Sequence, residues 1–70
     1  MDAAEIRDMS MEDLLAELDD SREALMRLRF QLTTGELTDH NQIRFTRRKI
    51  ARLQTIITER AAAENKEGEA

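Results

Sequence analysis

Seventy residues allow one small domain, whose limited core needs a metal, disulfides, a partner or very regular helix packing for stability. The absence of cysteine excludes disulfides and thiolate metal sites, and the single histidine cannot form a histidine zinc site. A chain without proline, with 40% hydrophobic and 37% charged residues, is typical of helical, coiled-coil-like proteins.

The net charge of −4 hides a strong polarity along the chain. Residues 1–26 carry nine acidic and two basic side chains, whereas residues 27–60 carry eight basic and three acidic ones. The chain has no apolar run near the ~18 residues of a membrane span, and its acidic start lacks the apolar stretch of a secretory signal. We therefore expect a protein of the cytoplasm with a local basic surface.

The first expected element is a short helix at about residues 2–8. Such a segment is far below the ~12–15 residues that an isolated helix needs. Ile6 is its only large apolar side chain. Any order here must therefore come from docking Ile6 against the rest of the protein.

The second expected element is a long helix at 11–34. Ser10 followed by Asp13 approximates a capping box, and Met9 with Leu14 fits a hydrophobic staple. Gly35 suits the left-handed position after a helix C-terminus. A heptad stripe of inward-facing positions is formed by Met11, Leu14, Leu18, Ser21, Leu25, Leu28 and Leu32.

The third expected element is a helix at about 40–63, started by Asp39, with Asn41 as a rival cap. Its stripe has the same heptad spacing and consists of Ile43, Thr46, Ile50, Leu53 and Ile57. The acidic tail at 65–70 has no apolar anchor, so we expect it to be disordered.

Two amphipathic helices joined by a short connection predict an all-α, coiled-coil-like antiparallel two-helix hairpin, with the short helix before it and one domain at 1–64. Pairing positions whose numbers sum to about 75 places Leu32 against Ile43 and centres the turn near residue 37. In this register Ser21 and Thr46 do not face each other. Their hydroxyls are expected to bond back to their own helices.

Folding the chain back brings basic side chains from both helices to the half of the hairpin near the turn. Six of these seven cations are arginines, whose planar guanidinium donates two parallel hydrogen bonds to a phosphate. Binding of a polyanion is one interpretation, and an ordinary solvated face is the other. The seven are Arg27, Arg29, Arg44, Arg47, Arg48, Lys49 and Arg52.

The two aromatic residues, Phe30 and Phe45, lie outside the heptad stripes, as do Met26 and Ile56. A two-helix rod has no third face to bury them. They predict a contact with nucleic acid or with another protein. The alternative is that the two phenylalanines cover the edges of a thin hairpin.

Nothing in the sequence predicts an enzyme. Adjacent acids point in different directions on a helix, so they form no acid–base pair. The sequence contains no glycine-rich phosphate loop and no Ser–His–Asp set, and we expect no cofactor, metal or small-molecule substrate. His40 lies in the turn, where we expect an ordinary loop residue.

Three segments carry a resemblance to a known family. LRFQ at 28–31, TGEL at 34–37 and RRKIARLQT at 47–55, in this order and spacing, resemble bacterial large-subunit ribosomal protein twenty-nine, the uL29 family. The opening Glu5-Ile6-Arg7 and the helix start after Ser10 are also similar to that family. The resemblance covers about residues 4–60, although this chain is acidic where most ribosomal proteins are basic.

The resemblance implies a helical hairpin bound to large-subunit rRNA near the exit of the peptide tunnel. It implies ribosomal protein twenty-three (uL23) as a neighbour. It also implies proximity to trigger factor and signal recognition particle, which meet the nascent polypeptide at the tunnel exit. Arginines that match the motifs become expected contacts to phosphate or sugar, and Ala51 is expected to be small so that the RNA can approach closely. Together with the basic run, the expected RNA-binding residues are Arg27, Arg29, Gln31, Arg44, Arg47, Arg48, Lys49, Arg52 and Thr55.

Two functions are alternatives to rRNA binding. A helical-hairpin adaptor that binds an acidic protein partner would use the same arginines and the exposed aromatics. A membrane-surface helix is disfavoured, because the hairpin uses up the apolar stripe and the overall charge is unsuited to anionic lipid. The acidic first half of the helix at 11–34 is expected to face solvent or a protein.

Overall fold

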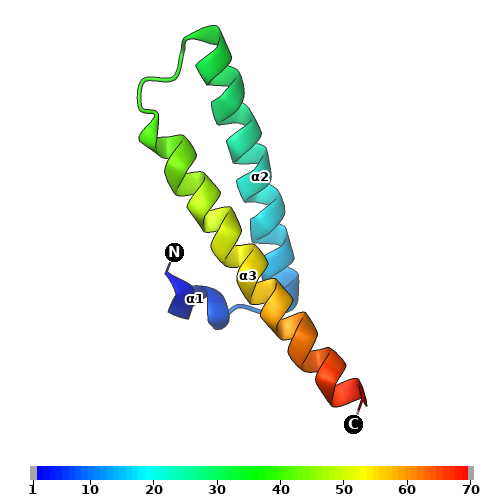
Figure 1. Ribbon diagram of the computed structural model, residues 1–70. Coiled ribbons are helices and arrows are strands. Elements are labelled where there is room, and N and C mark those ends of the chain that lie inside the picture. The colour runs from blue at the N-terminus through cyan, green and yellow to red at the C-terminus, as the bar shows by residue number, and fades with distance from the viewer. Residues whose placement is uncertain (1, 70) are drawn as a thin grey trace.

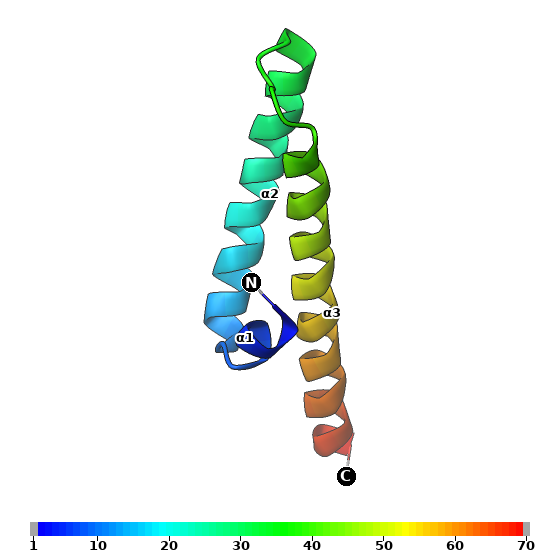
Figure 2. The ribbon, with the colours of Figure 1, turned by 90° about the vertical axis from the view of Figure 1, so that its left-hand side faces the viewer.

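The computed structural model describes residues 2–69, with side chains described for residues 2–64. Its elements are three helices: α1 (Ala3–Arg7), α2 (Met11–Thr34) and α3 (Asn41–Glu69). α2 and α3 pack antiparallel into a thin rod, and α1 folds back against α3 (Figures 1 and 2). The predicted all-α hairpin with a short N-terminal helix is therefore confirmed.

The helix ends follow local sequence signals. The Ser10 hydroxyl accepts the Asp13 N–H at 3.1 Å, so the predicted cap of α2 is confirmed. Gly35 ends α2 with φ +80°, the left-handed conformation that glycine adopts without a steric penalty. The Asp39 carboxylate accepts the Asn41 N–H at 2.9 Å and so caps the start of α3. Asp2 caps α1 in the same way, by accepting the Glu5 N–H.

The predicted register of the hairpin is wrong. Glu17 forms an ion pair with Lys49, and Ser21 lines the same hollow as Thr46. The residue numbers of facing positions therefore add up to well below the predicted 75. The end of α2 consequently extends past the start of α3, and residues 35–40 run back along the rod to link the two helices (Figures 1 and 2). Leu32, which was expected to pack against Ile43, is 43% exposed.

The buried core lies at the end of the rod away from the connection, where all three helices meet. It consists of Ile6, Leu14, Leu18, Leu53 and Ile56, with Ile6, Leu14 and Leu53 completely buried. The expectation that Ile6 docks α1 is confirmed. The expectation that Ile56 needs an outside partner is wrong, because α1 supplies the third face that a two-helix rod lacks.

Ser21 is the one buried polar side chain in the described part of the chain, at 4% exposure. Its hydroxyl has no hydrogen-bond partner, so the expected bond to its own helix is not formed. The hollow beside it measures about 130 Å³ and is also lined by Ala24, Thr46 and Lys49. The seam therefore contains an unsatisfied polar group opposite a second polar position.

α3 extends to Glu69, beyond the expected end at residue 63. The domain limits at 1–64 and the disordered tail at 65–70 stay predictions, and Ala70 lies outside the described residues.

Candidate nucleic-acid interface

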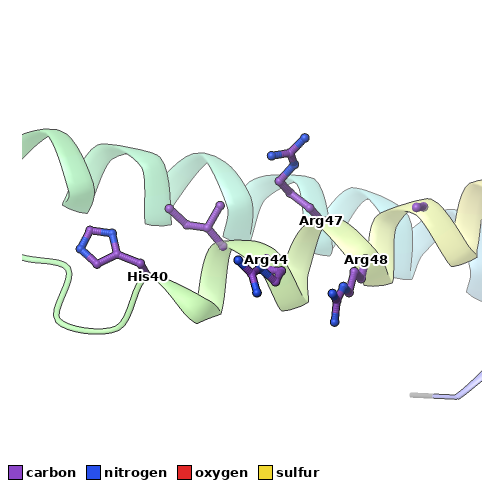
Figure 3. A pocket seen from close by; sticks show the side chains of 6 residues that line it. His40, Arg44, Arg47 and Arg48 are labelled. Atoms are coloured by element: carbon purple, nitrogen blue, oxygen red, sulfur yellow. The ribbon is translucent and has the colours of Figure 1, made fainter.

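The main candidate surface is a hollow of about 470 Å³ along the first half of α3. Three of its lining residues are the arginines 44, 47 and 48, all predicted for RNA binding and all exposed. Figure 3 shows Arg44 and Arg48 extending on one side of α3 and Arg47 on the other. The lining is completed by His40, Ile43 and Ala51, so within the described chain no carboxylate lines this hollow.

A second hollow continues from the first at Ala51, which lines both. It measures about 210 Å³ and lies where α1 meets α3, with Arg7 on one side and Arg52 and Thr55 on the other. The Thr55 hydroxyl donates to the Ala51 carbonyl at 2.8 Å, which leaves its oxygen able to accept further hydrogen bonds. The single methyl group of Ala51 leaves room between the two hollows.

A third hollow, of about 400 Å³, lies on α3 beside Phe45 and includes Lys49 and Arg52. Phe45 is 63% exposed, as expected for a residue outside the seam. Lys49 differs from the arginines, because its ammonium pairs with the Glu17 carboxylate of α2 and only 33% of its side chain is exposed. Its charge is thus partly neutralised within the protein.

The predicted residues of α2 are not brought into these hollows. Arg27 pairs with Glu23 at 3.7 Å on its own helix, with both side chains mostly exposed. It lines a separate hollow of about 320 Å³ together with Met26 and Phe30, which are 72% and 66% exposed. Arg29 is exposed and Gln31 partly buried, and none of the hollows described above includes either.

Comparison with known proteins decides the family. The family model for the ribosomal L29 protein matches residues 4–60. The chain is 48% identical over 60 residues to the large ribosomal subunit protein uL29 of Thermosipho africanus, covering 86% of this chain and 91% of the relative. It is also 48% identical to uL29 of Fusobacterium nucleatum, covering 86% and 100%, and 43% identical to uL29 of Streptomyces coelicolor, covering 83% and 78%.

This chain belongs to the uL29 family of ribosomal proteins. It is accordingly a structural constituent of the large ribosomal subunit and no enzyme, located in the cytoplasm on the ribosome, with rRNA and ribosomal proteins as partners. The family resemblance drawn from the three sequence motifs is confirmed. Separately, none of the helices in the described residues is long and apolar enough to cross a membrane.

The lining residues that the sequence did not predict include His40 and Arg7. His40 precedes Arg44 by four positions, which is the spacing of neighbours on one helix face, so this signal was available. Arg7 reaches the interface only because α1 docks on α3, where the Arg60 guanidinium donates to the Arg7 carbonyl. No local pattern in the sequence predicts that contact.

The chemistry of this uL29 surface is that of anion binding. Guanidinium groups donate hydrogen bonds and do not accept them, and they stay charged at physiological pH. Among the described residues no group of His, Asp and Glu side chains could hold a metal ion. The arginines of this surface can therefore bind phosphate oxygens.

Proposed function

We propose that this uL29-family protein binds large-subunit rRNA near the exit of the peptide tunnel through the outer face of α3. The observation that carries the proposal is that Arg44, Arg47 and Arg48 all line one open hollow whose described lining includes no acidic side chain. Arginines in such a position release counterions when they bind phosphates, which favours association with a polyanion.

The shape of the surface supports a path for one RNA strand. Arg44 and Arg48 are four residues apart, so their Cα atoms are separated by about 6 Å along the helix axis. The strand then passes over Ala51, where no side chain beyond a methyl group obstructs it, to Arg52 and Thr55. Phosphate contacts of this kind position the protein and carry little sequence information.

The rest of the surface is proposed to face proteins. The family resemblance implies uL23 as the neighbour and trigger factor and signal recognition particle as visitors at the tunnel exit. Met26 and Phe30 form an exposed apolar pair on α2 beside the Glu23–Arg27 ion pair. Mixed apolar and charged surfaces of this type are typical of protein contacts. Phe45 stays a predicted partner contact.

The experiment is cosedimentation of the tagged full-length chain with large ribosomal subunits at high salt. The triple variant Arg44→Gln, Arg47→Gln, Arg48→Gln should keep its helical circular dichroism and lose cosedimentation. Arg22→Gln, which removes one exposed charge from the acidic part of α2, is the control and should cosediment normally.

Binding to purified large-subunit rRNA gives the quantitative test. Loss of three phosphate contacts should reduce the slope of log affinity against log salt by about 2–3. If the triple variant retains the parent's slope, these arginines do not contact phosphate. If instead the chain prefers an acidic polypeptide to rRNA, the adaptor function is correct.

A further inference from the structure

We propose that His40 is a proton-dependent RNA contact, so that the affinity of this protein for rRNA rises as the pH falls. The inference rests on the proposed function and adds to it a binding residue and a regulation by protons. His40 is the only histidine in the chain, and the sequence alone suggested an ordinary loop residue.

The position of His40 is fixed by the start of α3. Its backbone carbonyl accepts the Ile43 N–H at 3.3 Å, and the neighbouring Asp39 caps the helix. The side chain is exposed and lines the same hollow as the three arginines (Figure 3). The imidazole thus lies at the end of the hollow where α3 begins, just before Asn41.

The charged groups around this imidazole are predominantly cationic. On α3 they are the three arginines that line the hollow, and in the connection they are the carboxylates of Glu36 and Asp39. Asp39 already accepts the Asn41 N–H. Neither carboxylate lines the hollow, nor does any charged side chain described in α1 or α2. An anion that enters the hollow would therefore face His40 without an internal carboxylate between them.

Protonation changes what His40 can offer to that anion. A neutral imidazole donates one hydrogen bond, whereas the charged form donates two and adds a positive charge. Histidine changes its charge between about pH 5 and 8, and an adjacent anion favours the charged form. Binding of a phosphate beside His40 should therefore take up a proton.

The consequences for affinity can be bounded. Uptake of one proton raises the affinity by at most about tenfold for each unit that the pH falls. The extra charge also neutralises one more phosphate. The slope of log affinity against log salt should therefore be steeper at low pH by about 0.7–0.9.

The test measures binding of the full chain to purified large-subunit rRNA between about pH 5.5 and 8 at constant ionic strength. The parent should bind several-fold more tightly at the acidic end. His40→Gln, which keeps a neutral hydrogen-bonding side chain, should match the parent at about pH 8 and lack most of this gain. Titration of the RNA and of the α-amino group affects both proteins equally and cancels in the comparison.

Two results separate this inference from the proposed function. If parent and His40→Gln have parallel pH profiles while the triple arginine variant loses binding, His40 is not a contact and the proposed function stands. If the triple variant binds rRNA like the parent, the proposed function itself fails. A salt slope that steepens at low pH in the parent but not in His40→Gln supports the inference, because a purely structural role would not change it.

Discussion

Replacing Ser21 by alanine should stabilise the protein. Ser21 is 4% exposed, and its hydroxyl has no hydrogen-bond partner in the seam between α2 and α3. Across the seam, Thr46 and Lys49 of α3 line the same hollow of about 130 Å³. Ser21→Ala removes the unsatisfied group and leaves the apolar contacts of its β-carbon in place.

The magnitude follows from the cost of the buried hydroxyl. An unsatisfied buried polar group costs about 1–3 kcal/mol, and alanine is also the best helix former. The loss of one oxygen removes a few dispersion contacts of about 0.1–0.2 kcal/mol each. The free energy of unfolding should therefore rise by about 1–2 kcal/mol, and Tm by about 4–8 °C for each kcal/mol.

Urea and thermal unfolding followed by circular dichroism measure this change. Ser10→Ala is the matched control, because it removes a serine hydroxyl that accepts the Asp13 N–H and should lower the stability by about 1 kcal/mol. A lower Tm for Ser21→Ala would refute the reasoning. It would mean that the hydroxyl has a partner in solution, such as Thr46 or a bound water molecule.

Three further changes test the fold and the interface. Ile6→Ala should lower the free energy of unfolding by about 2–5 kcal/mol in urea titrations, because a completely buried side chain that covers the core is lost. Gly35→Ala should cost about 1–2 kcal/mol in the same assay, since its φ of +80° is strained for alanine. Ala51→Leu should change stability by less than about 0.5 kcal/mol, because Ala51 is exposed, yet weaken rRNA binding several-fold by filling the space between the two hollows. Ala62→Leu, at another exposed position of α3, should leave rRNA binding unchanged.

The two ends of α2 and the start of α3 were predictable because each depends on a few neighbouring residues. The Ser10 cap and the left-handed Gly35 need no knowledge of the tertiary fold. The register was not predictable, because a heptad pattern presents the same face again after a shift of seven residues. The connection at 35–40 runs back along the rod from the end of α2 to the start of α3 (Figures 1 and 2). The pairing of Glu17 with Lys49 and the hollow shared by Ser21 and Thr46 correspond to a shift of about one heptad.

In the candidate interface, too, features fixed by local sequence could be predicted, whereas features that depend on the tertiary fold could not. The arginines of α3 were predicted as part of the basic surface, and the four-residue spacing of Arg44 and Arg48 places them on a common helix face. The pairing of Lys49 with Glu17 was not, since it depends on the register. Arg7 was missed because Ile6 alone gave no information about where α1 would dock.

The separation of acidic from basic side chains explains how a chain of net charge −4 can present a cationic surface. Two of the acidic side chains of α2 pair with Lys49 and Arg27, while within the described chain none lines the hollow of Arg44, Arg47 and Arg48. The rod is 19 Å and 15 Å across, and the screening length at physiological salt is about 8 Å. Carboxylates on the far side of the rod are therefore largely screened from an anion at α3. At low salt, where the screening length is about 30 Å, the same carboxylates should oppose binding and flatten the salt dependence.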